Sequence, residues 1–97
     1  MKILAIEREV MGIADNQFEP HLKQEATRVW ELYQAGVLRE IYFRQDQPSA
    51  VLVLECGDTQ EASEVLNSLP LVKANLITFD IIPLAPYPGF SRLFNAD

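Results

Sequence analysis

The sequence predicts an α+β fold with the element order β-α-β-β-α-β. Three observations lead to it: a helical pattern that ends at Gly36 and passes directly into a strand pattern, a hairpin of two strand patterns, and a second helical pattern before a last strand. This order is the split β-α-β, or ferredoxin-like, plan. We therefore expect a four-stranded antiparallel sheet with two helices on one face.

The first helix is expected to begin near Pro20 and to end at Gly36, where a glycine can adopt a positive φ and reverse the chain. Either Asn16 or Glu19 could cap its start, the latter with Pro20 as the first helical residue. Apolar side chains recur at the spacing of one helix face, which predicts a buried stripe. The stripe comprises Leu22, Ala26, Val29 and Tyr33, with Trp30 and Leu32 on its flanks.

Four segments show strand patterns: residues 2–9, 37–44, 49–56 and 76–82. The polar residues 45–48 between the second and third patterns end in proline, which predicts a turn and therefore a β-hairpin. Residues 50–54 are apolar on both faces of the strand. Such a pattern is typical of a central strand that is covered on each side.

The second helix is expected to begin at Asp58, because Glu61 follows three residues later in a capping-box pattern. We expect Pro70 to close this helical region. Its buried stripe would contain Ala62, Val65, Leu66 and Leu69. We divide the chain into a domain, residues 1–84, and a C-terminal tail, residues 85–97, which is too rich in proline for further regular structure.

Composition excludes several classes of partner. Of the 97 residues, 14 are acidic and 8 are basic, which gives a formal net charge of −6. Phosphate groups bind basic surfaces, so nucleic acids and anionic membranes are excluded. No apolar run is long enough for a membrane span or a signal peptide, and we expect a cytoplasmic protein. Cys56 is the only cysteine and His21 the only histidine, so we expect no internal disulfide and no metal site.

The sheet face opposite the helices is also expected to carry many apolar residues. A contiguous exposed apolar patch marks an interaction site. A two-fold dimer in which two sheets pack face to face would cover the patch, so we expect a homodimer or a higher oligomer. The tail would lie across the partner or close the pocket through Tyr87, Phe90, Leu93 and Phe94.

Residues 36–42, residues 69–71 and the strand through Ile77 and Asp80 together resemble the muconolactone Δ-isomerase family of the dimeric α+β barrel superfamily. The family has matching residues at Gly36, Arg39, Leu69, Pro70, Leu71, Asp80 and Pro86, and a tryptophan where Tyr42 stands. This resemblance implies a ferredoxin-like subunit, association into dimers or larger rings, and a cofactor-free proton shift on a small unsaturated lactone acid. The chain departs from the family at Leu76 and Thr78, where the isomerases have acidic residues.

The first helix carries the candidate catalytic residues. His21, Glu25 and Arg28 recur at i, i+4 and i+7, at the rim where helix meets sheet. A proton shift next to a carbonyl needs a base, which Glu25 or His21 could supply, and Glu25 also matches a family glutamate. A cation, Arg28 or Arg39, would hold a substrate carboxylate. The alternative is an ordinary exposed helix pair of Glu25 with Arg28 and a surface His21.

The strand patterns contain polar residues that would line the cavity of a two-sheet barrel if they pointed inward: Glu7, Arg39, Tyr42, Glu55 and Asp80. Arg39 and Tyr42 have opposite parity, so a regular strand cannot point both inward. We favour Tyr42, with Glu55 or Asp80 as its polar neighbour, and rim ion pairs are the alternative. The residues assigned to substrate binding are Arg28, Arg39, Tyr42 and Trp30.

The first hypothesis is a cytoplasmic, cofactor-free isomerase that acts on a small acidic or lactone metabolite, with Glu25 and His21 as catalytic residues. A non-catalytic oligomeric domain that binds a small ligand is the alternative. A cofactor-free monooxygenase acting on an aromatic substrate would share the fold. RNA binding is disfavoured, because residues 49–56 contain no aromatic side chain for base stacking.

Overall fold

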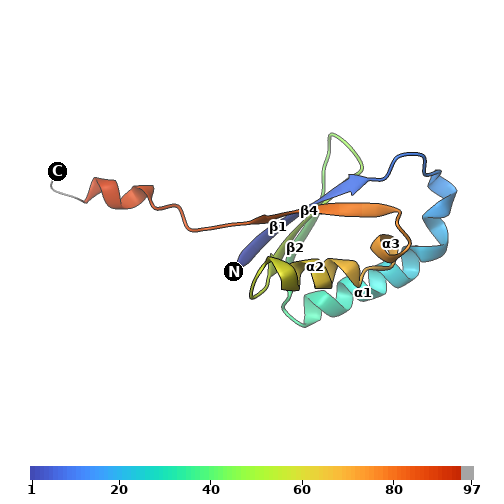
Figure 1. The fold of residues 1–97 in the computed structure, drawn as a ribbon, viewed down its shortest axis with the longest axis horizontal. Helices are drawn as coiled ribbons and strands as arrows, with labels where there is room; N and C mark the ends of the chain where they lie inside the picture. The colour runs from blue at the N-terminus through green and yellow to red at the C-terminus, as the bar shows by residue number, and fades with distance from the viewer. Residues whose placement is uncertain (95–97) are drawn as a thin grey trace.

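The computed structural model describes residues 1–94, in which four antiparallel strands form one sheet with helices on one of its faces (Figure 1). The strand order is β2-β3-β1-β4, which confirms the predicted ferredoxin-like α+β plan. The strands are β1 (Lys2–Glu9), β2 (Leu38–Phe43), β3 (Ala50–Glu55) and β4 (Ile77–Pro83). The helices are α1 (Leu22–Gln34), α2 (Thr59–Asn67) and α3 (Pro70–Lys73), and the short 3-10 helices are η1 (Asp15–Gln17), η2 (Glu19–His21) and η3 (Gly89–Leu93).

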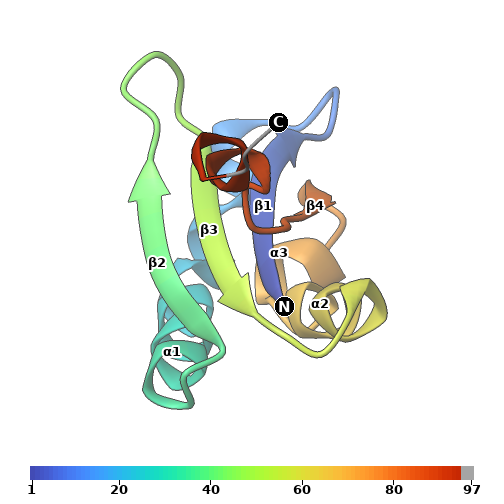
Figure 2. The ribbon, with the colours of Figure 1, turned by 90° about the vertical axis from the view of Figure 1, so that its left-hand side faces the viewer.

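The register of β1 with β3 decides which side chains face the helices. Ile3 lies opposite Leu54 and Ala5 opposite Leu52, and all four side chains are buried. Directly opposed residues point to the same side of a sheet, so this is the helix-covered face. Residues between them, such as Leu4, point to the other face, which the helices leave uncovered (Figure 2). The main core comprises Ile3, Ala5, Leu32, Leu38, Ala50, Leu52, Leu54, Cys56, Ala62, Leu66 and Leu69.

The end of α1 follows the prediction. Gly36 has φ +78°, a left-handed conformation that favours glycine. The N–H of Gly36 donates to the carbonyl of Tyr33 at 3.1 Å, and the N–H of Val37 donates to the carbonyl of Leu32 at 3.1 Å. This pair of bonds is a Schellman motif, which satisfies the last carbonyls of the helix and turns the chain into β2.

The helix begins at Leu22, close to the predicted Pro20, but both predicted caps are wrong. Two consecutive 3-10 turns, η1 and η2, occupy the segment before Leu22, and neither Asn16 nor Glu19 caps the helix. His21 holds the N-cap position and its side chain makes no capping bond. The backbone explains the difference, because carbonyls rather than side chains accept the N–H groups here: the N–H of His21 donates to the carbonyl of Phe18 at 2.9 Å.

The predicted burial of α1 also needs correction. Only Leu32, which the pattern placed on a flank, is buried among the residues of α1. Leu22 and Tyr33, from the predicted stripe, are each 51% exposed. The stripe faces open space between α1 and β2 rather than a tightly packed sheet, and this space forms the cavities described below.

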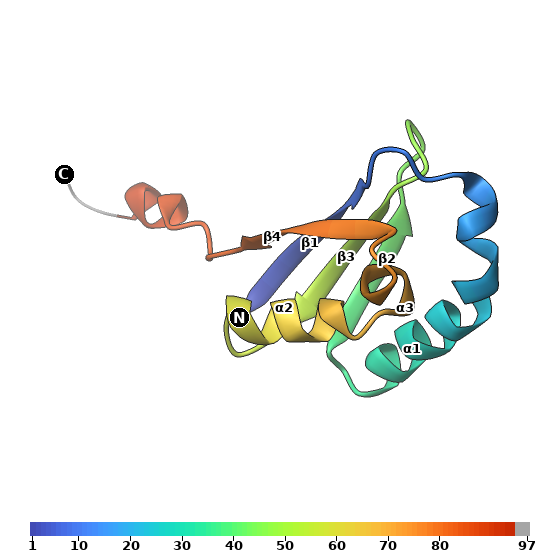
Figure 3. The same cartoon turned by 45° about the vertical axis from the view of Figure 1, so that its right-hand side comes forward.

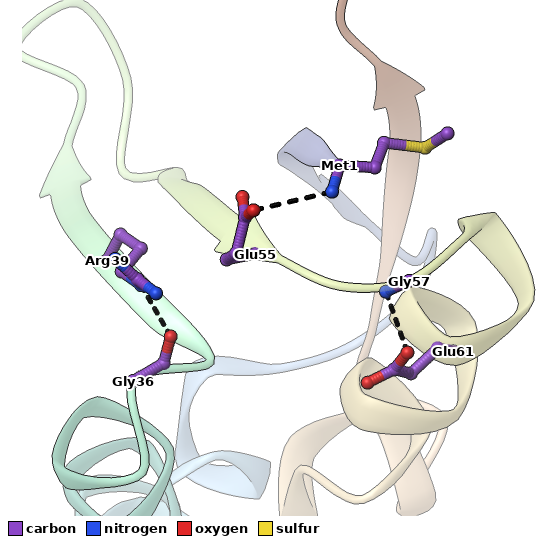
Figure 4. Close-up of polar contacts among 6 residues, drawn as sticks. All are labelled: Met1, Gly36, Arg39, Glu55, Gly57 and Glu61. Atoms are coloured by element: carbon purple, nitrogen blue, oxygen red, sulfur yellow. Dashed lines mark hydrogen bonds and ion pairs between the residues drawn. The ribbon is translucent and has the colours of Figure 1, made fainter.

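The second helical region divides at Ser68. The Asp58 carboxylate accepts the N–H of Glu61 at 2.8 Å, which confirms the predicted cap of α2, and the Glu61 carboxylate accepts the N–H of Gly57 at 2.7 Å (Figure 4). Pro70 does not close this helix. It is the first residue of α3, a position that suits proline because the first N–H of a helix needs no intrahelical partner.

Beyond β4 the chain extends away from the domain as an arm, which we define as residues 84–94 (Figures 1 and 3). Its 3-10 helix η3 corrects the expectation of an entirely irregular tail. The ring of Tyr87 packs edge to face against Phe90, with centroids 5.1 Å apart. The large apolar side chains of the arm are nevertheless exposed to solvent. Residues 95–97 lie outside the described part of the chain. The exposed side chains are Leu84, Tyr87, Phe90, Leu93 and Phe94.

Candidate functional site

An apolar cavity of about 340 Å³, which we call the inner cavity, lies between α1 and the helix-covered face of the sheet. Its volume is within the range of small-molecule sites. Two carboxylates interrupt the apolar lining: Glu7 from β1 and Glu25 from the first turn of α1. The remaining lining residues are Leu22, Ala26, Val29, Ile41, Phe43, Ala50, Leu52, Leu69, Leu71, Ile77 and Phe79.

A second hollow, the outer groove, continues along α1 and the edge strand β2 with a volume of about 510 Å³. The two spaces share three lining residues, Ala26, Val29 and Ile41, so they are neighbouring compartments of one helix-strand interface. The outer groove contains most of the predicted binding residues. Its other lining residues are Trp30, Tyr33, Leu38, Arg39, Glu40 and Tyr42.

Glu25 is held in the inner cavity by the backbone of α3. Its Oε1 accepts a hydrogen bond from the N–H of Leu71 at 2.9 Å, and the side chain is partly buried. Burial raises the pKa of Glu25, against the opposing effects of this hydrogen bond and of the nearby His21. A carboxylate with a raised pKa on an apolar cavity has the properties of a general base.

Glu7 is the second acid of the inner cavity; the sequence analysis included it among the polar strand residues that could line a cavity but gave it no catalytic or binding role. The alternation Ile3, Ala5, Glu7 places it on the helix-covered face of β1. Its Oε1 accepts the N–H of Ala50 at 3.3 Å. Burial raises the pKa of Glu7, the Ala50 hydrogen bond opposes this shift, and the charges of Glu9 and Glu25 add to it. That alternation was the signal in the sequence that could have identified this residue.

Two residues of the predicted helix stripe differ in their surroundings. His21 holds the N-cap position of α1 and is close enough to Glu25 for its charge to lower the pKa of that carboxyl group. Arg28 lies outside the lining of both spaces. Its Nε donates to Ser68 Oγ at 3.0 Å, and its Nη1 lies 3.6 Å from Glu31 Oε1. The structure therefore brings His21 near Glu25 but places Arg28 between α1 and the end of α2.

The other predicted binding residues line the outer groove. Arg39 donates through Nε to the carbonyl of Gly36 at 2.5 Å (Figure 4), and the Trp30 ring stacks on Tyr33 with centroids 5.7 Å apart. Glu25 and Gly36 are eleven residues apart, which corresponds to about 16 Å along a helix axis. Glu25 lines only the inner cavity and Arg39 only the outer groove, so the predicted residues form two groups.

Neither predicted polar neighbour is hydrogen-bonded to Tyr42, although the strand register places Glu55 and Asp80 on the same sheet face as Tyr42. Tyr42 lies opposite Val51, on the sheet face that the helices leave uncovered, and its hydroxyl donates to Glu40 Oε1 at 2.8 Å. Asp80 pairs instead with Arg8. Glu55 lies 3.4 Å from the amino group of Met1 (Figure 4). These polar residues therefore form exposed pairs, as in the alternative prediction that they make ion pairs at the rim of the sheet.

Residues 1–94 contain no group of three or more histidine, cysteine, aspartate or glutamate side chains placed to hold a metal ion. No helix in this part of the chain is long and apolar enough to cross a membrane. Cys56 is buried in the core, as expected for a small apolar side chain, and burial raises the pKa of its thiol. The charged side chains that line the inner cavity are the carboxylates of Glu7 and Glu25.

Comparisons with known proteins agree with this architecture. A search of curated protein sequences gave no match. The crystal structure of muconolactone isomerase superimposes with a TM-score of 0.73 at 13% identity, over 92% of this chain and 93% of the other. 5-Chloro-2-hydroxyhydroquinone dehydrochlorinase from Burkholderia phenoliruptrix AC1100, in complex with 2,5-dihydroxybenzoquinone, superimposes with a TM-score of 0.64 at 13% identity, over 90% and 96%. The sequence profile of muconolactone delta-isomerase matches residues 6–89, and this chain belongs to that family.

Proposed function

We propose that this protein is a cofactor-free isomerase of the cytoplasm that shifts a proton on a small unsaturated lactone, with Glu25 as the general base. The observation that carries the proposal is the position of Glu25: a partly buried carboxylate with a raised pKa faces an apolar cavity large enough for such a substrate. Membership of the muconolactone delta-isomerase family supports the same reaction class.

In this proposal Glu25 removes a proton from the saturated carbon attached to the far end of the C=C bond that is conjugated with the substrate carbonyl. The hydrogen bond from the N–H of Leu71 fixes the orientation of the carboxylate, and the apolar walls keep water away from the reacting carbon. His21, one helical turn before Glu25 and close enough for its charge to lower the pKa of that carboxyl group, would favour negative charge on the substrate. Arg39, Tyr42 and Trp30 would bind only those ligands that extend from the inner cavity into the outer groove.

Proton NMR of muconolactone in D₂O tests the proposal directly. The wild-type protein is expected to form the isomerised lactone and to remove the signal of the abstracted C–H hydrogen. Glu25→Gln should abolish both changes, because the amide cannot accept the proton, while it retains an oxygen that accepts the Leu71 N–H. Glu64→Gln, on the exposed side of α2, is the matched control. Wild-type protein that leaves muconolactone unchanged would contradict the proposal.

One observation favours the alternative of a ligand-binding protein without catalysis. The described lining of the inner cavity contains no lysine or arginine that could hold a substrate carboxylate, while the neighbouring outer groove is large and aromatic. The related dehydrochlorinase was crystallised with a planar quinone, and a ring of that kind would suit such a groove. Calorimetric binding of 2,5-dihydroxybenzoquinone that Trp30→Ala weakens, together with inactivity toward muconolactone, would favour this second function.

We also propose that the chain works as a homodimer or a higher oligomer through its arm. Tyr87, Phe90, Leu93 and Phe94 expose their apolar side chains on a segment that extends away from its own domain. Such surface is costly in water unless another molecule covers it. A second copy offers the uncovered sheet face, where partly exposed Val51 and its neighbours lie. Light scattering that gives a mass of 11.0 kDa, the mass of one chain, would contradict this proposal.

A further inference from the structure

Glu7 lines two separate spaces. On one side it faces the inner cavity, and on the other it lines a polar cavity of about 280 Å³ formed by residues of β1 and of the loop before β3. The other residues of this polar cavity are Arg8, Glu9, Gln47, Pro48 and Ser49, most of which are exposed to solvent. Glu7 therefore stands at a boundary between an apolar cavity and a compartment that water can reach.

The position of Glu7 at this boundary is fixed by β3. The N–H of Ala50 donates to its carboxylate at 3.3 Å, and the hydroxyl of Ser49 donates to its backbone carbonyl at 2.9 Å. Ser49 and Ala50 are consecutive residues where the loop enters β3, so the same short segment holds both the main chain and the side chain of Glu7. A carboxyl group held in this way can face the inner cavity without losing contact with the polar one.

The two acids of the inner cavity are not equivalent. The charge of Glu25 raises the pKa of Glu7, since two neighbouring carboxylates disfavour the state in which both are ionised. The other charges near the pair are Glu9 beside Glu7 and His21 beside Glu25, and the backbone N–H groups of Ala50 and Leu71 bind one carboxylate each. Like-charge repulsion favours a state in which the pair holds one proton, and of the two acids only Glu7 also borders the polar cavity.

We propose that Glu7 is the general acid of this site: it donates a proton to the second carbon of the substrate and is reprotonated from water through the polar cavity. This role rests on the proposed isomerase function. Glu25 takes the proton from the first carbon, and the electron pair of the broken C–H bond moves into the conjugated carbonyl to form a dienolate. The O–H bond of Glu7 then breaks as a C–H bond forms at the second carbon, and the double bond shifts. Water returns a proton to Glu7 and removes one from Glu25, which restores both acids.

A titration tests whether the two carboxyl groups share one electrostatic environment, independently of any substrate. Carbon-13 NMR of protein labelled at the glutamate carboxyl carbons follows each group, and the Glu7 signal is identified by its loss in Glu7→Gln. We expect the Glu7 midpoint to fall in Glu25→Gln, because a neighbouring like charge is removed, and to stay unchanged in Glu64→Gln. A Glu7 midpoint that does not move in Glu25→Gln would overturn the proposal whether or not the protein is an enzyme.

Turnover of muconolactone in D₂O then tests the direction of proton transfer. Wild-type product should carry solvent deuterium at the newly protonated carbon. Glu7→Gln should lower turnover by about a hundredfold, the usual contribution of a general acid, and its residual product should carry the hydrogen that Glu25 removed from the substrate. A Glu7→Gln product with wild-type deuterium content would overturn the role of Glu7 at any turnover rate. A merely structural effect of the substitution would slow the reaction but would leave the source of the hydrogen at the newly protonated carbon unchanged. If wild-type protein is inactive toward muconolactone, the proposed function fails and this role fails with it.

Discussion

The carboxylate of Glu25 on α1 accepts the backbone N–H of Leu71 on α3 at a distance of 2.9 Å. One side chain thus orients a candidate base and joins two helices that are distant in sequence. Pro70 precedes this N–H at the start of α3, where the chain leaves Leu69 in an extended conformation. The contact connects the stability of the domain with the chemistry of its cavity, and substitutions can separate the two.

Glu25→Ala should lower the free energy of unfolding by about 1–3 kcal/mol, because the partly buried N–H of Leu71 loses its acceptor. Glu25→Gln should be closer to the wild type in stability, since its amide oxygen can accept the same hydrogen bond. Urea denaturation monitored by circular dichroism measures both variants, with slopes compared to confirm that the unfolded states are similar. Equal stability of the two variants would argue that this hydrogen bond is broken in solution.

Stability should decrease as the pH rises through the titration range of the two cavity acids. The pKa values of Glu7 and Glu25 are both raised above their usual value of 4.5, so between that value and the raised ones the folded state binds more protons than the unfolded state. Their contribution is fully present below about pH 4.5 and is lost as the pH passes the raised pKa values. Urea denaturation at a series of pH values should show a steeper loss for wild type than for the double variant Glu7→Gln, Glu25→Gln. Parallel curves for the two proteins would contradict the raised pKa values.

Arg28→Ala should weaken the packing of α1 against the end of α2 without changing turnover in the inner cavity. The guanidinium donates to Ser68 Oγ at 3.0 Å, and the loss of such a bond costs about 0.5–1.5 kcal/mol. Thermal denaturation measures the first effect and muconolactone NMR the second, with Arg28→Lys as the variant that keeps the charge. If Arg28→Ala lost turnover at unchanged stability, Arg28 would bind substrate, as the spacing in the sequence suggested.

Removal of the arm should change the oligomeric state. A chain that ends at Ala85 lacks every exposed aromatic side chain of the arm but retains β4. We expect light scattering to show at least twice the mass of one chain for the full-length protein and the mass of one chain for the truncated form. Met11→Ser, which removes a different and highly exposed apolar side chain, is the control. Identical oligomers with and without the arm would assign the interface to another surface.

The elements that were predictable from the sequence are those encoded by a few neighbouring residues. Gly36 specifies the end of α1 because its positive φ closes a Schellman motif, and Asp58 specifies the start of α2 because its carboxylate accepts the N–H of Glu61. The four strands were predictable for the same reason, since each strand pattern is contained in a short run of neighbouring residues. Pro70 shows the limit of this reasoning, since a proline that follows one helix is equally suited to begin the next.

The site was less predictable because it depends on how α1 lies against the sheet. Spacing alone placed Glu25 and Arg28 on one side of the helix, yet Glu25 reaches α3 and the inner cavity while Arg28 reaches Ser68. Glu7 belongs to the site only because β1 is central and its helix-covered face reaches beneath α1. Such contacts follow from tertiary packing between distant segments, which helix and strand periodicity do not describe.

The shallow burial of α1 gives this domain an unequal distribution of local stability. Leu32 is the buried residue of α1, whereas β1 and β3 contribute Ile3, Ala5, Leu52 and Leu54 to the core, so we expect separation of α1 to cost less apolar burial than separation of the central strands. The free energy of opening α1 is therefore lower than that of global unfolding, and its amide hydrogens should exchange with solvent faster than those of the central strands. We expect local opening of α1 to widen access to the inner cavity while the sheet stays intact.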